Sequence, residues 1–194
     1  VLGYEGLDRI VRETLIETNM VPDRAFETGM DFYFSLSPKE HVTLELEIGC
    51  NLERPHQFMG YADALSASRF ELAATTKHFP QISSSNSRFS DWIARSFSDL
   101  EMMIAGNPER DYPYAGVPWF STVFGRDGII TALQTLWLNP DIARGVLEFL
   151  ASQQADEVDS FADSEPGKIL HEMRRSEMAT LGEVPFGRYY GSVD

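Results

Sequence analysis

The stretch FGRDGIITALQTLWLNPDIARGVLEFLAS (residues 124–152) predicts two helices joined by a short turn. In the first helix, expected from about Asp127 to Leu138, apolar residues recur every three or four positions. The second helix is expected to start after Asn139, a favourable N-cap, with Pro140 at its first position. Its apolar set is Ile142, Val146, Leu147, Phe149 and Leu150. Because the joining turn is so short, the two helices are expected to be antiparallel neighbours.

Helical patterns extend to both sides of this stretch. Residues 62–78 are rich in Ala, Leu and Glu and predict a linking helix. The segment SRFSDWIARSFSDLEMMIAGNP predicts a strongly amphipathic helix that ends at residues 106–108. A further helix is predicted over residues 168–181. Repeated helix hairpins of this kind favour a helical barrel or toroid.

The first fifty residues show a period of two instead, which is typical of half-buried antiparallel strands. Strands are predicted around residues 32–36, around residues 42–48, and over residues 7–19. The alternating apolar positions are Phe32, Phe34 and Leu36 in one strand, and Val42, Leu44, Leu46 and Ile48 in the next. Residues 1–55 are therefore expected to be the end of an N-terminal β-sandwich domain.

The composition narrows the function classes. The 194 residues carry a formal net charge of −14, which disfavours nucleic acid and anionic membrane surfaces as partners. Cys50 is the sole cysteine, so neither an intramolecular disulfide nor a Cys-based zinc cluster is expected. No stretch reaches the roughly 20 apolar residues of a membrane helix, and a cytoplasmic location is expected.

Motifs for metal, phosphate or serine chemistry are missing from the sequence. His171-Glu172 begins like a zincin motif, but Arg175 stands where the second histidine is needed. There is no glycine-rich phosphate loop and no Gly-x-Ser-x-Gly elbow. No metal or cofactor is therefore expected.

Aromatic and charged residues gather in three loop segments instead, and this combination suits a sugar ligand. Aromatic rings pack on sugar C–H faces, while carboxylates and guanidinium groups bind vicinal hydroxyls. Candidate substrate-binding residues are Trp119, Phe120, Arg126, Asp127, Glu172, Tyr190 and Asp194. A structural interpretation stays open, because Asp127 is favoured at a helix start by the helix dipole alone. By pattern alone, Trp119 and Phe120 are more typical of a hydrophobic core than of a sugar platform.

Two long segments carry a family resemblance. AGVPWFSTVFGRDGIITALQTLWLNPDIARGVLEFLASQQ and DSEPGKILHEMRRSEMATLGEVPFGRYYGSVD resemble the bacterial glycogen-debranching-enzyme-like proteins of the amylo-α-1,6-glucosidase type. The resemblance implies the first hairpins of an (α/α)6 toroid at residues 86–194, with residues 56–85 as a linking helix and loop. The chain then looks like an internal fragment of a longer enzyme.

The resemblance also implies an inverting glycosidase that acts on oligosaccharide or α-glucan ends. Arg126 and Asp127 would bind hydroxyls of the terminal sugar, with Trp119 and Phe120 lining the pocket. Inversion requires a carboxylic acid and a carboxylate roughly 6.5–9.5 Å apart. Both are expected on hairpins after Asp194, so no catalytic residue is assigned. The alternative is a non-catalytic carbohydrate-binding or scaffold protein with the same toroid fold.

Overall fold

The computed structural model describes residues 1–50, 56–75, 79–104 and 111–192. The chain divides into two compact units, unit 1 at Val1–Phe70 and unit 2 at Glu71–Asp194. The domain limits predicted at residues 55 and 85 stay predictions.

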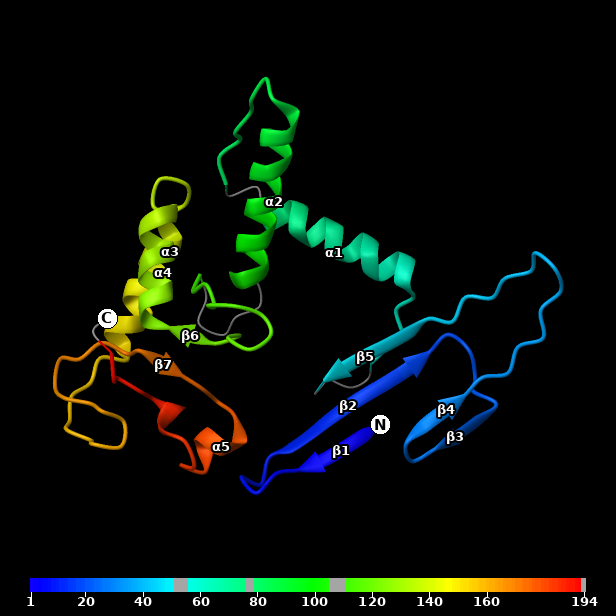
Figure 1. The fold of residues 1–194 in the computed structure, drawn as a ribbon, viewed down its shortest axis with the longest axis horizontal. Helices are drawn as coiled ribbons and strands as arrows, with labels where there is room; N and C mark the ends of the chain where they lie inside the picture. The colour runs from blue at the N-terminus through cyan, green and yellow to red at the C-terminus, as the bar shows by residue number, and fades with distance from the viewer. Residues whose placement is uncertain (51–55, 76–78, 105–110, 193–194) are drawn as a thin grey trace. The chain divides into compact units, whose positions relative to one another are not determined.

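Unit 1 contains a three-stranded antiparallel sheet in the order β1-β2-β5 (Figure 1). Its strands are β1 (Leu2–Glu5), β2 (Val11–Thr18) and β5 (Leu46–Cys50). The central strand β2 pairs with β1 along one edge and with β5 along the other. The prediction of antiparallel strands at the start of the chain is confirmed, and β2 lies within the predicted range 7–19.

The strand predicted over residues 32–36 is wrong. The short strand β4 (Gly29–Asp31) ends before these residues and pairs with β3 (Arg24–Phe26). The alternation is still visible in the side chains, because the rings of Phe32 and Phe34 stack with their centroids 6.4 Å apart. A strand also needs a partner ladder, and no partner for residues 32–37 exists in the described part of the chain.

The strand predicted over residues 42–48 is shorter than expected, and its better-covered face is the opposite one. β5 begins only at Leu46, and Leu46 and Ile48 are 54% and 66% exposed. Glu47, which lies between them, is half-buried. The cause is the segment after β5, which returns over the Glu47 face: the N–H of Met59 donates to Glu47 Oε2 at 2.8 Å.

Two helices follow the sheet, as predicted. α1 (Tyr61–Thr75) and α2 (Ser87–Ile104) are separated by residues without regular structure at 79–86. The predicted end of the second helix at residues 106–108 lies outside the described residues. None of the residues of α2 is fully buried, although Phe97 stacks on the buried Phe79 at 4.9 Å between ring centroids. In the described ranges, no helix is both long and apolar enough to traverse a lipid bilayer.

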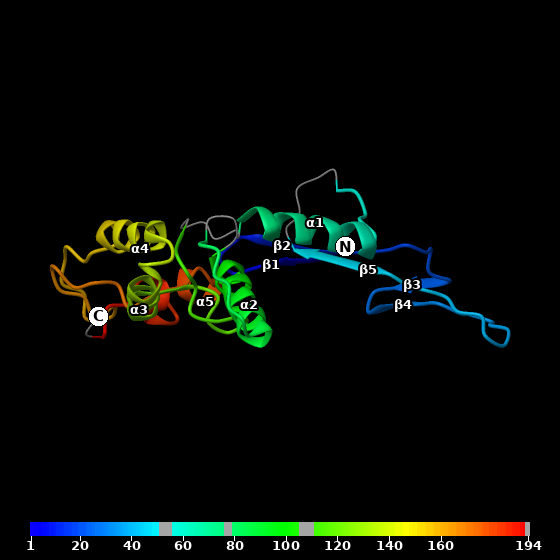
Figure 2. The ribbon, with the colours of Figure 1, turned by 90° about the horizontal axis from the view of Figure 1, so that it is seen from above.

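Helices α3 (Gly125–Thr135) and α4 (Pro140–Ser152) lie side by side as a helical hairpin (Figure 1, Figure 2). Asn139 caps α4 as predicted, because its side-chain oxygen accepts the N–H of Asp141 at 3.0 Å. Three residues of the predicted apolar set are buried against the core of unit 2: Ile142, Val146 and Leu150. One hairpin does not make a ring, so the (α/α)6 toroid stays a prediction.

The helix predicted over residues 168–181 is wrong. Residues Glu172–Met173 form strand β7, which pairs with β6 (Val123–Phe124). Within residues 168–181, only α5 (Glu177–Thr180) is helical. The 3-10 turn η2 (Pro185–Gly187) follows it. The backbone N–H groups of His171 and Glu172 donate to the carbonyl of Tyr189 at 2.8 and 3.2 Å. These groups are therefore not available for helical hydrogen bonds.

Candidate functional site

The three segments that carry most of the predicted site residues meet in unit 2. β6 runs directly into α3, pairs with β7, and β7 in turn bridges to Tyr189. The N–H of Tyr189 donates to the carbonyl of Glu172 at 2.9 Å, and that of Gly125 donates to the carbonyl of His171 at 2.9 Å. A set of backbone hydrogen bonds therefore holds residues 119–127, 171–174 and 186–190 together.

A row of aromatic rings runs across these three segments. Phe120 meets Phe124 at 5.8 Å between ring centroids, and Phe124 meets His171 at 5.9 Å. The row continues from His171 to Tyr189 at 6.1 Å and from Tyr189 to Phe186 at 5.4 Å. All four contacts are edge-to-face, an arrangement that aromatic quadrupoles favour. The row explains why aromatic residues gather here without requiring a ligand for each ring.

Glu172 lies in this region, but its carboxylate already has an ion-pair partner. Its side chain is 8% exposed and forms an ion pair with Arg174 Nε. The Arg174 guanidinium also lies over the Phe124 ring, 6.0 Å from its centroid, and its Nη1 donates to the carbonyl of Trp119 at 3.4 Å. A buried, paired carboxylate positions Arg174 and the loop, so Glu172 is better suited to a supporting role than to direct contact with a ligand.

Trp119 and Phe120 are open to solvent, at 78% and 51% exposure. The loop that carries them is nevertheless tied down, because Gly116 and Phe120 exchange two backbone hydrogen bonds of 3.1 and 2.7 Å. This exposure disfavours the alternative that Trp119 and Phe120 belong to the hydrophobic core of unit 2. Exposed aromatic rings on a fixed loop are available to a ligand.

Arg126 and Asp127 occupy the first turn of α3, where Arg126 is exposed and Asp127 is half-buried. Neither side chain forms a hydrogen bond or an ion pair with another residue that the structure describes. Phe124 occupies the N-cap position, so Asp127 stands in the first turn and does not cap the helix. The fork predicted for two sugar hydroxyls stays a prediction.

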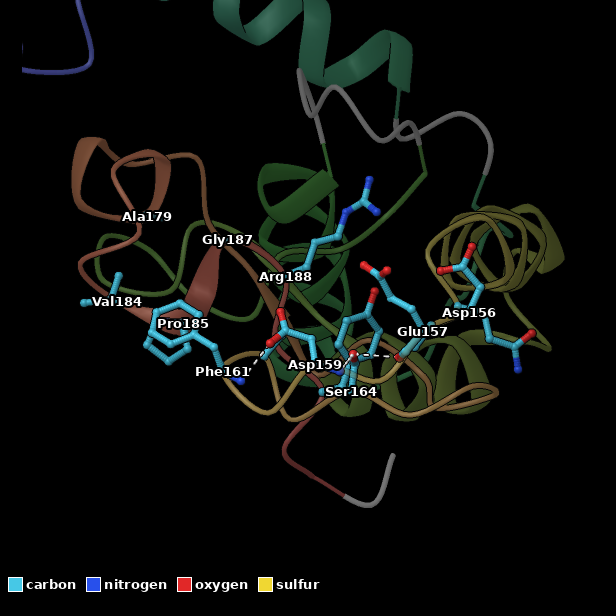
Figure 3. A pocket seen from close by; sticks show the side chains of 14 residues that line it. Asp156, Glu157, Asp159, Phe161, Ser164, Ala179, Val184, Pro185, Gly187 and Arg188 are labelled. Atoms are coloured by element: carbon cyan, nitrogen blue, oxygen red, sulfur yellow. Dashed lines mark hydrogen bonds between the residues drawn. The ribbon is translucent and has the colours of Figure 1, made fainter.

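A hollow of about 260 Å³ opens between the acidic loop after α4 and the segment around η2 (Figure 3). Carboxylates line one wall, from Asp156, Glu157 and Asp159, while Arg188 reaches in from the other segment. The loop is shaped by its own hydrogen bonds, in which Ser164 Oγ donates to the carbonyl of Glu157 at 2.9 Å. The hollow therefore brings several carboxylates and one guanidinium group together on a loop held by hydrogen bonds.

A second hollow, of about 310 Å³, lies beside the β6–β7 pair. Arg174 and Arg175 line it together with the hydroxyl-bearing Ser121, Thr122 and Ser176. The sequence did not reveal either arginine as a site residue, because the helix predicted over 168–181 brings neither Arg174 to the carbonyl of Trp119 nor Arg175 to this hollow. The adjacent basic pair in an otherwise acidic chain was the available signal.

Tyr190 belongs to the wall of the first hollow and is only 5% exposed. Its hydroxyl donates to the carbonyl of Gln153 at 2.7 Å, and its N–H donates to the carbonyl of Ala162 at 2.9 Å. Burial raises the pKa of Tyr190 above its ordinary value of 10.0, Arg188 opposes this effect, and Asp156 adds to it. Tyr190 thus joins the acidic loop to the end of α4. The last predicted site residue, Asp194, lies outside the described residues.

The raised pKa of Tyr190 predicts a loss of stability in alkali. The folded state keeps the phenol neutral while the unfolded chain ionises near its ordinary pKa of 10.0, so the free energy of unfolding falls as the pH rises past that value. Tyr190→Phe removes the part of this pH dependence that comes from the phenol. The variant also loses the hydrogen bond to Gln153, which lowers the free energy of unfolding by about 1 kcal/mol at neutral pH. The stability difference between parent and variant should therefore narrow above about pH 10, as urea unfolding at a series of pH values would show.

The control for this measurement is Tyr61→Phe, which removes a tyrosine that is 67% exposed. This variant should follow the parent at every pH. A constant gap between parent and Tyr190→Phe across the alkaline range would contradict the burial argument.

Comparison with known proteins adds no family assignment. No protein-family model matches the chain, and no curated protein matches it either.

Proposed function

We propose that the chain is part of a glycoside hydrolase of the glycogen-debranching-enzyme-like type, and that residues 119–127 and 171–176 form part of its sugar-binding wall. The observation that carries the proposal is the pair of exposed rings, Trp119 and Phe120, which directly precede Ser121 and Thr122 in the chain; these two residues line a hollow together with Arg174 and Arg175. Rings supply packing for sugar C–H faces, and arginines and hydroxyls supply hydrogen bonds to sugar hydroxyls. The ligand class is an oligosaccharide or an α-glucan end.

The fold part of the proposal is the six-hairpin toroid. The α3–α4 hairpin supports it, because such a ring is made from repeated antiparallel helix pairs. The loop before this hairpin carries the candidate binding residues Trp119 and Phe120, and the first turn of α3 carries Arg126 and Asp127. The lone exposed Cys50 fits the reducing cytoplasm, which is the compartment we propose.

The mechanism that we propose is inverting hydrolysis by two carboxyl groups, one protonating the leaving oxygen and one activating water. No residue of the chain is assigned to either role. Glu172, a buried carboxylate that follows His171 of the aromatic row, is held by Arg174, which favours a binding function for this region. The same observation favours the second candidate, a carbohydrate-binding or scaffold protein without turnover.

Trp119→Ala should weaken binding of a maltooligosaccharide at least tenfold, which corresponds to about 1.4 kcal/mol. The indole is 78% exposed, so its removal should take away contact area with the ligand and leave the fold intact. Isothermal titration calorimetry with maltotetraose, and with a trisaccharide that contains an α-1,6 linkage, measures the effect. Unfolding midpoints of parent and variant should agree.

Trp137→Ala is the matched control, because this tryptophan of unit 2 is also largely exposed, at 70%, and lies just after α3. It should leave sugar affinity unchanged. Equal affinity of the Trp119→Ala protein and the parent would rule out the proposed sugar wall. Glucose release from a branched limit dextrin by the full-length protein separates the hydrolase from the binding protein, and inversion of the product anomer by ¹H NMR tests the mechanism.

A further inference from the structure

Three residues that are distant in sequence meet on one face of the sheet in unit 1. Glu17 lies on β2, Glu47 lies on β5, and His56 follows β5. One potential ligand atom from each lies within 4.8 Å of the other two. His56 Nε2 is 2.9 Å from Glu47 Oε1 and 3.8 Å from Glu17 Oε2. Both carboxylates therefore converge on a single ring nitrogen.

The register of the sheet makes this cluster costly without a cation. Glu17 and Glu47 are direct partners in the β2–β5 ladder, and like charges directly opposite each other destabilise an antiparallel pair. Nε2 of His56 carries at most one hydrogen, which the shorter contact to Glu47 takes. Glu17 Oε2 is buried and has no hydrogen-bond partner among the described residues.

The Glu47 carboxylate is oriented so that it can act as a ligand. Its Oε2 accepts the N–H of Met59 at 2.8 Å, which orients the carboxylate and leaves Oε1 directed at the cluster. A ligand carboxylate that a second hydrogen bond holds in place is typical of metal sites.

We propose that Glu17, Glu47 and His56 bind one Zn²⁺ ion that clips β2, β5 and the segment before α1 together. Two carboxylates and an imidazole match the oxygen and nitrogen ligands of zinc, and three protein ligands leave one position for water. Ligand atoms around a tetrahedral ion at about 2.0–2.2 Å lie about 3.3–3.6 Å from one another. The two distances to His56 Nε2, 2.9 and 3.8 Å, lie on either side of that range.

The ion would remove the conflict in the cluster. It would place positive charge between the facing carboxylates of Glu17 and Glu47, and it would give the buried Glu17 oxygen a partner. The three side chains are 22% to 35% exposed, so the ion has access from solvent. Cys50 takes no part, because it is three positions from Glu47 on the same strand and therefore lies on the opposite face.

Chelator-treated protein should bind one equivalent of Zn²⁺, and its unfolding midpoint should rise on binding. Titration calorimetry with Zn²⁺, Mn²⁺, Ca²⁺ and Mg²⁺ measures the affinities, and the visible absorption of bound Co²⁺ reports the coordination directly. Glu17→Gln and His56→Gln should each weaken Zn²⁺ binding at least about tenfold. Glu17→Gln should also stabilise the metal-free protein, because it removes one of the two facing charges.

Matched controls come from the same unit. Glu13→Gln changes an acid on the same strand face as Glu17, and His41→Gln changes an exposed histidine. Both should bind Zn²⁺ as the parent does. Unchanged affinity in Glu17→Gln or His56→Gln would overturn the proposal, and so would tighter binding of Ca²⁺ or Mg²⁺ than of Zn²⁺. Absorption of Co²⁺ that is identical in parent and His56→Gln would do the same without depending on stability.

Discussion

Replacing Gly128 with alanine should lower the free energy of unfolding of unit 2 by about 2–4 kcal/mol. A Cβ at this position would lie 2.4 Å from the hydroxyl of Tyr112 and 2.6 Å from the ring carbon that bears it. Tyr112 is completely buried and donates to the carbonyl of Phe124 at 2.8 Å. The ring must therefore move, which disturbs the core and the start of α3 together.

Alanine is the better helix former by about 1 kcal/mol, and this gain opposes the clash. The clash is expected to prevail, because overpacking a core costs about 1–3 kcal/mol and an unpaired buried carbonyl costs about 1–3 kcal/mol more. Urea unfolding followed by circular dichroism measures the sum.

The control is Gly116→Ala, where the nearest atom to an added Cβ is 3.8 Å away, an ordinary contact distance. It should change stability by less than about 0.5 kcal/mol. In a Tyr112→Ala background the Gly128→Ala change should cost much less than it does alone, because the clashing ring is gone. Additive effects of the two substitutions would refute the close packing of Tyr112 on α3.

Arg174→Met should cost about 3 kcal/mol of stability. Methionine keeps an apolar chain near the Phe124 ring but removes the charge that pairs with Glu172. Because the Glu172 side chain is only 8% exposed, the substitution leaves a carboxylate buried without its partner. Thermal and urea unfolding of the variant measure the loss.

Arg95→Met tests whether burial of the ion pair is the cause of the stability loss expected for Arg174→Met. Arg95 pairs with Asp99 at 2.8 Å on α2, but the two side chains are 76% and 50% exposed. Solvent-exposed pairs contribute about 0–1 kcal/mol, so this variant should stay within that range. If the two variants lost equal stability, burial of Glu172 would not be the deciding factor. Glu172→Gln combined with Arg174→Met should recover part of the loss, because no charge is then left buried.

The helical hairpin was predictable because its signals are local. The apolar period of α4, the Asn139 cap and the position of Pro140 all act within a few residues. Strands depend on a partner elsewhere in the chain, and for this reason the period around Phe32 and Phe34 did not reveal that no ladder forms there. A closed (α/α)6 ring needs contacts beyond one hairpin and stays a prediction.

The role of Glu172 shows how one wrong element misplaces a site residue. Under the predicted helix over 168–181, Glu172 and Arg174 point in different directions. In the extended backbone that includes β7, residues two positions apart share a face, and the two side chains form an ion pair. Trp119 and Phe120 kept their candidate role because their exposure is compatible with it, while the roles of Arg126 and Asp127 stay predictions.

The zinc proposal concerns residues that no spacing in the sequence joins. Glu17, Glu47 and His56 lie on separate segments, and the shared face follows from the β2–β5 register. A single slip in that register would move Glu17 to the other face of the sheet. Such a set is therefore accessible only once the pairing of the strands is known.

The contacts of unit 2 differ in how far apart their residues lie in the sequence, and this separation predicts which contacts form first. α3 and α4 are joined by residues 136–139, whereas Thr122 reaches Met173 over 51 positions to hydrogen-bond its carbonyl. Closing a long loop costs more chain entropy than closing a short one, and local contacts form sooner. The α3–α4 hairpin is therefore expected to form first in unit 2, and the segments that carry Trp119 and Arg174 are expected to come together only when the distant β6–β7 ladder closes.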